Sequence, residues 1–296
     1  MGGRSYLYVP GDQHTKLQRA ISFGADAIII DLEDSVAFSS KSAARMLLES
    51  WLKDLSSGEL ATSHLPEIWV RINPFTSNEP NATQADLTVA VAPGVAGVCL
   101  AKCQSPSEIS QLNNLLVEAE SRAGLEVGSI RVSALLESAR GILSAESIAT
   151  SERIERLQIG EADLCADLGL NPGSDELELL PLRSLVVLAS ASAGLEGPIG
   201  PVSTDFRNLD DFRNSTERLK RLGFTARALI HPAQIPVSNE VFTPTDEEIA
   251  AAQTLIEEFH SAFTRGEGVL VDVHGKMVDE AVVRAARRTL ARAARE

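Results

Sequence analysis

Two acidic residues of this chain follow short apolar runs and could share one metal ion. Glu137 comes directly after SALL, and Asp163 lies in QIGEADL. If both carboxylates lie at neighbouring strand ends, they can bind Mg²⁺, which prefers oxygen ligands and keeps part of its hydration shell. The alternative is that one carboxylate caps the helix that follows, as Asp readily does. Spacing alone leaves both interpretations open.

Basic residues near similar runs could bind an anion. Arg71 in WVRINP can hold a substrate carboxylate through two nitrogens and does not lose its charge. It could also pair with an acid of the DLED segment such as Glu33, and that pairing would orient the guanidinium. Lys102 and His231 fit hydrogen-bonding residues beside the site better than catalytic bases.

The elements that would position these residues are short apolar runs that alternate with helical stretches. This alternation is typical of βα units and a parallel sheet. We expect strands over residues 6–9, 27–32, 68–72, 97–101, 132–136, 154–159, 198–202 and 227–230. Eight strands within about 230 residues favour a (β/α)8 TIM barrel, with a doubly wound open sheet as the alternative. No G-x-G-x-x-G follows the first strand, so the usual dinucleotide reason for an open sheet is absent.

In a TIM barrel, groups at the carboxyl ends of the strands meet on one face. Polar or ionisable residues at or just after the expected strand ends are Asp31, Glu33, Asp34, Arg71, Asn73, Lys102, Glu137, Glu161, Asp163 and His231. One such residue means little, because loops of any α/β protein are polar. Six strand ends that carry such residues predict an active site.

The α/β barrel is expected to occupy residues 1–264 as one catalytic domain, followed by an extension over residues 265–296. This extension holds the hairpin-like stretch GEGVLVDVHGKMVDE and an Ala- and Arg-rich helix, and it is basic, unlike the whole chain. It could be a solvated amphipathic helix that covers the barrel or a neighbouring subunit. It could also be a mobile cap that carries one reactive group.

Composition excludes several classes of function. The formal net charge of -14 opposes nucleic-acid binding, which needs clustered Lys and Arg. No run of eighteen apolar residues predicts a membrane span, and the N-terminal segment lacks a signal pattern, so we expect a cytoplasmic protein. Cys99, Cys103 and Cys165 fit buried thiols in a reducing compartment.

As a set, the motifs resemble the citrate lyase β-subunit-like branch of the HpcH/HpaI aldolase superfamily. The matching segments are YVPGD, GADAIIIDLEDSV with the following K-x-x-A-R (Lys41, Ala44, Arg45), VRINP, LLESARG, IGEADLCADLG, LGFTARALIHPAQI and GKMVDEAVVRAA. They cover nearly the whole chain in the family order. Two departures are Leu100-Ala101-Lys102 for the usual Leu-Pro-Lys and Leu136-Glu137-Ser138 for the usual Ile-Glu-Thr.

The resemblance implies a trimeric or hexameric TIM barrel that uses Mg²⁺ and acts on acyl-thioesters, usually of coenzyme A. It would cleave or form a carbon–carbon bond between an acyl-CoA and a 2-oxo acid. By motif, Glu137 and Asp163 would bind Mg²⁺, and Arg71 with Glu137 would contact the substrate. Asp279 matches the aspartate that family members insert across a subunit boundary as the general acid/base.

The expected substrate is a carboxylated 3-hydroxyacyl-CoA of the malyl-, methylmalyl-, citramalyl- or citryl-CoA kind. Arg4, Lys16, Arg19 and the basic final helix are candidates for coenzyme A contacts, although each could be ordinary surface charge. The alternatives are an aldolase on free 2-oxo acids, a lyase subunit acting on a carrier-protein thioester, and a barrel that has lost catalysis.

Overall fold

The computed structural model describes residues 3–57, 65–264, 270–271 and 277–294, which form two compact units, Met1–Asn239 and Glu240–Glu296. The strands are β1 (Ser5–Pro10), β2 (Ala27–Asp31), β3 (Glu67–Ile72), β4 (Val95–Leu100), β5 (Arg131–Leu136), β6 (Ile154–Ile159), β7 (Ile199–Gly200), β8 (Ala226–Leu229), β9 (Leu270–Val271) and β10 (Met277–Val278). The α-helices are α1 (His14–Ala20), α2 (Lys41–Ser56), α3 (Ala82–Ala90), α4 (Pro106–Ala123), α5 (Ala139–Leu143), α6 (Ala145–Ala149), α7 (Glu161–Leu168), α8 (Leu180–Ser192), α9 (Leu209–Leu222), α10 (Gln234–Phe242), α11 (Asp246–Thr264) and α12 (Glu280–Ala293), with single 3-10 turns at Phe38–Ser40 and Leu177–Leu179.

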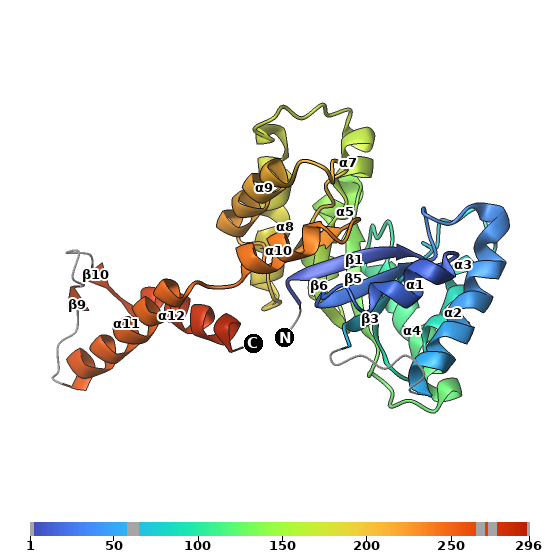
Figure 1. The fold of residues 1–296 in the computed structure, drawn as a ribbon, viewed down its shortest axis with the longest axis horizontal. Helices are drawn as coiled ribbons and strands as arrows, with labels where there is room; N and C mark the ends of the chain where they lie inside the picture. Colours follow the sequence, from blue (N-terminus) through green and yellow to red (C-terminus); the bar gives the residue numbers. More distant parts are fainter. Residues whose placement is uncertain (1–2, 58–64, 265–269, 272–276, 295–296) are drawn as a thin grey trace. The chain divides into compact units, whose positions relative to one another are not determined.

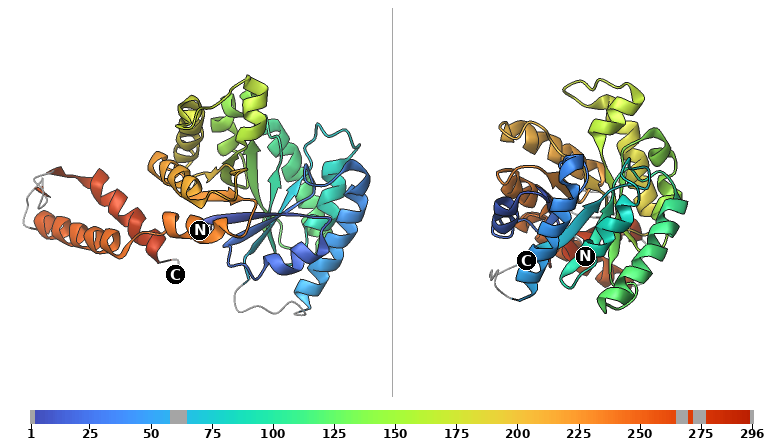
Figure 2. Two further views of the ribbon diagram at one scale, coloured as in Figure 1. Left: turned by 45° about the horizontal axis from the view of Figure 1, so that its top comes forward. Right: turned by 90° about the vertical axis from the view of Figure 1, so that its right-hand side faces the viewer.

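Strands β1 to β8 form a closed parallel barrel in chain order. The barrel closes because β1 pairs with both β2 and β8, so that Tyr6 lies opposite Ala27 on one side and Ala228 on the other. Helices surround the strands (Figures 1 and 2). The prediction of a (β/α)8 TIM barrel is confirmed, and the open sheet is excluded.

The barrel interior is filled by side chains of unequal size. Trp69 and Tyr6 are almost fully buried and meet edge to face, with ring centroids 6.4 Å apart. Small residues such as Ala226 leave room for them. Gly97 is required here, because a Cβ at that position would lie 2.4 Å from the Trp69 ring. The interior is therefore a packed core and not a pore.

Helix α4 illustrates how local sequence signals set the helix ends. Ser105 and Glu108 form a capping box at its start, and Gly124 ends it in a left-handed conformation with φ of 69°. In its last turn, the buried carboxylate of Glu120 accepts hydrogen bonds from the Arg153 guanidinium at 2.6 and 2.9 Å. It also accepts from the amides of residues 128 and 130. One carboxylate therefore ties α4 to the segments that lead into β5 and β6.

The unit Glu240–Glu296 contains α11 packed against α12 and the antiparallel pair β9–β10, in which Met277 lies opposite Val271. Helix α11 belongs to this compact unit, whereas the sequence places the domain boundary after residue 264. The extent of the catalytic domain, residues 1–264, stays a prediction. Much of the expected hairpin-like stretch, including Gly275 and Lys276, lies outside the described residues.

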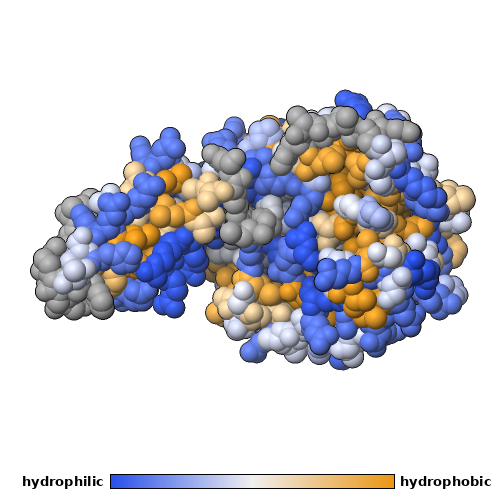
Figure 3. Space-filling model, turned by 90° about the horizontal axis from the view of Figure 1, so that it is seen from below, coloured by the Kyte–Doolittle hydropathy of each residue, from blue (hydrophilic) through white to orange (hydrophobic). Residues whose placement is uncertain are grey.

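On the face drawn in Figure 3, hydrophobic residues are visible among hydrophilic ones on the barrel unit and on the C-terminal unit. Met277 and Val282 are exposed in that unit. Within the described residues, no helix combines the length and the apolar character that crossing a membrane requires.

We expect Glu120→Gln to lower the free energy of unfolding by roughly 3–5 kcal/mol at neutral pH, because it leaves Arg153 buried without a charged partner. Burial alone would raise the pKa of Glu120, but its hydrogen bonds from Arg153 and two amides outweigh burial and lower it. The stabilisation is therefore complete above the unfolded pKa and is lost as the pH falls through the lowered folded pKa. Urea unfolding from pH 7 to pH 3 measures this. An unchanged difference between the two proteins at pH 3 would contradict the charge argument.

Candidate active site

A cavity of about 730 Å³ opens at the carboxyl ends of the barrel strands. Its walls include the ends of β1, β2, β3, β5 and β6 and the first turn of α7. All of its lining residues belong to the unit Met1–Asn239. Because the carboxyl ends of the strands meet here, most of the predicted strand-end residues share one face.

Arg71 lies at the end of β3 and lines this cavity. Its Nε and Nη2 donate to the two oxygens of Asp31 at 2.6 Å each, and its Nη1 lies 3.3 Å from Glu33 Oε2. The guanidinium also lies over the ring of Tyr8, 5.0 Å from the centroid. Burial opposes the charge of Arg71, but Asp31 outweighs burial and raises the pKa well above its ordinary value. Arg71 thus presents a fixed positive charge in a fixed orientation.

Asp31 is the last residue of β2, and the loop after it folds back onto its carboxylate. The amides of Glu33 and Ser35 donate to Asp31 at 2.9 and 3.0 Å. Burial raises the pKa of Asp31, but the charge and hydrogen bonds of Arg71, together with those amides, outweigh it and lower the pKa. Asp31 therefore stays ionised and holds Arg71. The predicted contact between Arg71 and Glu33 is present, but Asp31 is the main partner of Arg71.

Helix α2 anchors the same loop from outside the barrel. Lys41 donates to the carbonyl oxygens of residues 32 and 33 at 2.8 and 3.0 Å and to Asn73 Oδ1 at 2.7 Å. Arg45, one turn later, pairs with Asp86 at 2.7 Å, and Asp86 accepts from the amide and the side chain of Asn73. The K-x-x-A-R segment therefore supports the loop that carries Glu33.

Lys102 follows β4 and joins two sides of the site. Its backbone is left-handed, with φ of 51°, and its amide donates to Glu137 Oε1 at 2.8 Å. Its Nζ lies 2.6 Å from Glu33 Oε1 and 3.0 Å from Asp34 Oδ1. Burial lowers the pKa of Lys102, but the hydrogen bonds to Glu33 and Asp34 outweigh burial and raise it. Lys102 is thus a charged hydrogen-bonding group and a poor base.

Glu137 follows β5 and is 7% exposed. Gly160 makes room for it, because a Cβ at position 160 would lie 2.8 Å from Glu137 Oε2. Burial raises the pKa of Glu137 to about 8, opposed by the hydrogen bond from the Lys102 amide. Among the described residues, no basic side chain forms an ion pair with this carboxylate, and the charge of Arg71 lowers the pKa of Glu137 by less than burial raises it.

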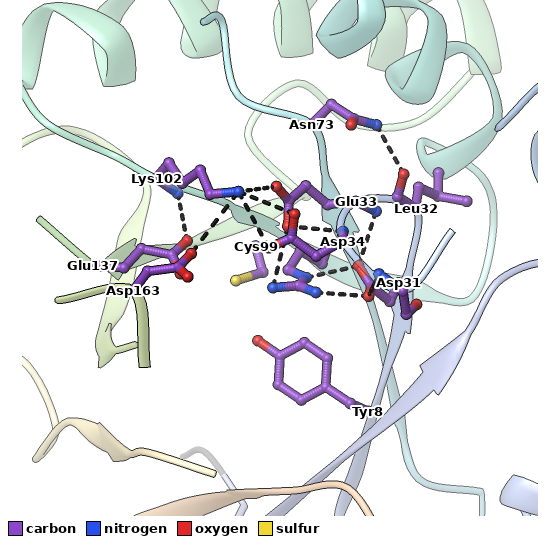
Figure 4. Close-up of polar contacts among 12 residues, drawn as sticks. Tyr8, Asp31, Leu32, Glu33, Asp34, Asn73, Cys99, Lys102, Glu137 and Asp163 are labelled. Carbon is purple, nitrogen blue, oxygen red and sulfur yellow. Dashed lines mark hydrogen bonds and ion pairs between the residues drawn. The ribbon is translucent and has the colours of Figure 1, made fainter. Parts of the chain in front are cut away.

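Asp163 lies in the first turn of α7 and points toward Glu137 (Figure 4). Its Oδ2 is 3.9 Å from the Lys102 ammonium. Neither acid takes the capping role that was the alternative: Gly160 occupies the N-cap of α7, and Ser138 caps α5. Among the described residues, no group of three or more His, Cys, Asp or Glu side chains could hold a metal. Two carboxylates with water and substrate oxygens remain a donor set that suits Mg²⁺.

His231 lies on the rim of the cavity, apart from the carboxylates. Its ring stacks on Phe206 with centroids 4.8 Å apart, and its Nδ1 accepts from the Ala233 amide. These contacts agree with a supporting role for His231 rather than that of a base.

The basic residues proposed for coenzyme A separate in the structure. Lys16 and Arg19 on α1 line the cavity. Arg4 precedes β1, at the opposite end of the barrel, and pairs with Asp26 at 2.9 Å. The expectation for Arg4 is therefore wrong, because it was placed by its nearness in sequence to β1 and not by the direction of the strand.

Asp279 lies in the other compact unit. Its Oδ1 accepts from the amides of Ala281 and Val282 at 2.9 and 3.1 Å, so it caps the start of α12. The part assigned to Asp279 by resemblance stays a prediction.

Tyr8 and Gln158, which we did not predict as site residues, also line the cavity. Gln158 on β6 donates to the hydroxyl of Tyr8 at 2.9 Å, and the buried thiol of Cys99 lies 3.8 Å from Gln158 Oε1. Strand alternation could have placed Tyr8 inside the barrel, since Tyr6 and Tyr8 share one face of β1. For Gly160, the signal was a glycine between an apolar run and an acidic helix start.

Comparisons with known proteins agree with this geometry. Residues 4–232 match the family model described as HpcH/HpaI aldolase/citrate lyase. The chain is 33% identical over 295 residues to the citrate lyase subunit beta of Leuconostoc mesenteroides subsp. cremoris, covering 97% of this chain and 92% of that protein. It is 34% identical over 290 residues to a (3S)-malyl-CoA thioesterase of Cereibacter sphaeroides, covering 98% and 94%.

Among solved structures, CitE from Mycobacterium tuberculosis in complex with magnesium, acetoacetate and coenzyme A is similar with a TM-score of 0.74 and 27% identity, covering 99% of this chain and 98% of that one. The citrate lyase beta subunit from the same organism, complexed with oxaloacetate and magnesium, gives a TM-score of 0.66 at 26% identity over 82% of this chain and 98% of that one. The chain therefore belongs to the HpcH/HpaI aldolase/citrate lyase family, as its motifs predict.

Proposed function

We propose that this enzyme is a Mg²⁺-dependent carbon–carbon lyase that cleaves, or forms, a carboxylated 3-hydroxyacyl-CoA. The products of cleavage would be an acyl-CoA and a 2-oxo acid. The observation that carries the proposal is the buried carboxylate of Glu137, which lies beside Asp163 and has no basic partner among the described residues. A divalent cation would supply the missing charge. The similarity to CitE, whose structure holds magnesium and coenzyme A, supports this assignment.

Glu137 and Asp163 would hold the cation. The Lys102 amide keeps Glu137 in place, and Gly160 leaves the space that this carboxylate needs. When bound, Mg²⁺ would polarise the hydroxyl and carboxylate groups of the substrate. The side chain of Asp163 is 47% exposed, so water and substrate could reach a cation held there.

In cleavage, the bond breaks between the hydroxyl-bearing carbon and the carbon next to the thioester carbonyl. The carboxylate of Asp279 would take the proton of the substrate hydroxyl, whose oxygen becomes the carbonyl oxygen of the departing 2-oxo acid. The bonding electron pair would move onto the thioester fragment, which becomes an enolate. Arg71, already oriented by Asp31, would face the enolate oxygen where negative charge develops. Asp279 would return a proton to the enolate carbon. We propose that Asp279 comes from a neighbouring subunit of a trimer or hexamer.

The residues that line the cavity favour a thioester over a free 2-oxo acid. Its acidic end holds Glu137 and Asp163, whereas residues such as Val9, Phe23 and Ile230 line an apolar wall. Lys16 and Arg19 of α1 also face the cavity and would attract the phosphates of coenzyme A. An aldolase for free 2-oxo acids would have no use for this wall. A carrier-protein thioester remains the second candidate, because one relative is a subunit of citrate lyase.

We expect Glu137→Gln and Asp163→Asn each to lower kcat/KM by at least about 100-fold, because each removes one of two ligands. Purified protein with Mg²⁺ would be given malyl-, methylmalyl-, citramalyl- and citryl-CoA, and release of glyoxylate, pyruvate or oxaloacetate would be followed. Glu49→Gln changes an exposed carboxylate that pairs with Lys53 on α2 and serves as the control. Full turnover by either site variant would refute the metal assignment. No product from wild-type protein with any CoA thioester would favour the carrier-protein substrate.

The raised pKa of Glu137 predicts a pH-dependent stability in EDTA. Because burial raises the folded pKa to about 8, above the ordinary 4.5, the metal-free protein loses stability as the pH rises through that interval. Glu137→Gln removes this loss, so its thermal midpoint relative to wild type should rise between pH 5 and pH 9. Each kcal/mol corresponds to roughly 2–4 °C. Calorimetry in EDTA measures the difference, and a difference that does not change with pH contradicts the prediction.

Asp279→Asn tests the acid/base role without removing the helix cap, since Asn is as good an N-cap as Asp. We expect kcat to fall by about 100-fold or more, the range typical of a general acid/base, with an unchanged thermal midpoint. Glu280→Gln, at the next position of α12, should keep wild-type turnover. If Asp279→Asn keeps full kcat, Asp279 is only a helix cap.

A further inference from the structure

Lys102 serves the two halves of the site through different atoms. Its amide holds Glu137, whereas its ammonium contacts Glu33 and Asp34 and lies 3.9 Å from Asp163 Oδ2 (Figure 4). The left-handed backbone at Lys102, with φ of 51°, accompanies this arrangement. Such a conformation is uncommon for a residue with a side chain. Because the contact to Glu137 uses the backbone amide, the side chain of Lys102 can be changed while that hydrogen bond is retained.

We propose that the ammonium of Lys102 weakens the binding of a divalent cation by the Glu137–Asp163 pair and favours the binding of the anionic substrate. This inference rests on the proposed function, because it concerns the same cation and the same cavity. Lys102 does not line the cavity, so it acts through the charge that it places behind Asp34 and Asp163. It is a positioning and electrostatic residue rather than a catalytic one.

The guanidinium of Arg71, which also lies near these acids, is already engaged elsewhere. Arg71 gives two hydrogen bonds of 2.6 Å to Asp31, which leaves Lys102 as the closer cation to Asp34 and Asp163. Asp34 and Asp163 both line the cavity, and their side chains are 54% and 47% exposed. Without the ammonium, these two acids would present more uncompensated negative charge to a ligand. That charge attracts a metal ion and repels a carboxylate.

Coulomb's law sets the size of the effect. Even in water, a unit charge about 4 Å from another changes binding by roughly fivefold, and the effect on a divalent ion is larger. The Lys102 side chain is 34% exposed, so salt screens part of its field. We therefore expect a change of about tenfold for the cation and several-fold for the anion. Both changes should shrink as the ionic strength rises.

The sign of the two changes separates this role from a purely structural one. If Lys102 only held the loop after β2 in place, its loss would disorder the site and weaken both ligands. If its charge matters as proposed, the metal ion binds more tightly and the anion binds more weakly. Lys102→Met keeps an unbranched side chain without the charge, and Lys102→Arg keeps the charge. Lys53→Met removes a similar ammonium that pairs with Glu49 on α2 and is the matched control.

The experiment measures Mn²⁺ binding to the full-length protein by electron paramagnetic resonance without substrate, and pyruvate binding at saturating Mn²⁺ by calorimetry. Relative to wild type, Lys102→Met should bind Mn²⁺ about tenfold more tightly and pyruvate several-fold more weakly. Lys102→Arg and Lys53→Met should stay within about twofold for both ligands.

Weaker Mn²⁺ binding by Lys102→Met, or no change, would overturn the inference. Glu137→Gln tests the proposed function in the same assay, since it should lose the Mn²⁺ site. If wild type and Glu137→Gln bind Mn²⁺ equally, both the metal site and the inference fail. If only Glu137→Gln loses the ion while Lys102→Met matches wild type, the metal site stands and the inference fails alone.

Discussion

The carboxylate of Glu33 is shared between the two cations of the site, and the arrangement of the other charged groups depends on this sharing. One oxygen accepts from Lys102 at 2.6 Å, and the other lies 3.3 Å from Arg71 and accepts from the Asp34 amide. Glu33 is almost fully buried, and burial raises its pKa despite the charge of Arg71. A displacement of this one carboxylate would change the positions of both cations. The contacts of Lys41 to the loop backbone make such a displacement costly.

The two ends of the barrel divide stability from chemistry. Toward the amino ends of the strands, Trp69 and Tyr6 fill the interior and Glu120 satisfies four donors. At the carboxyl ends, Glu137 is buried without a comparable set of partners in the described residues. A carboxylate left in this state opposes folding, and the packed end of the barrel offsets that cost. A bound cation would lower the cost of burying Glu137, whereas the packed end of the barrel is stable without a ligand.

Sequence reasoning predicted the barrel and the neighbourhood of the site because both follow from periodic features. Apolar runs mark strands, and the carboxyl ends of parallel strands must converge, so Arg71, Glu137 and Asp163 could be placed together before any coordinates. Features that depend on three-dimensional contacts were missed. The need for glycine at position 160 comes from a carboxylate that follows another strand, and the left-handed conformation of Lys102 accompanies contacts to residues far away in the sequence. Arg4 was misplaced because proximity along the chain does not say which end of a strand a residue occupies.

Strand β7 has only two residues and forms the shortest pairings in the barrel wall. Its Ile199 lies opposite Gln158 of β6 on one side, and Ile199 and Gly200 lie opposite Ala226 and Arg227 of β8 on the other. Because β7 is so short, we expect amide hydrogens along these two strand pairs to exchange by local opening earlier than those of the longer strands. Just beyond β7, Val202 contributes to the apolar wall of the cavity. The backbone around β7 can therefore move while the other strand pairs of the barrel stay intact. The proposed acyl-CoA substrates, where they differ by a methyl group, would meet a compliant surface on this side and a charged one on the other.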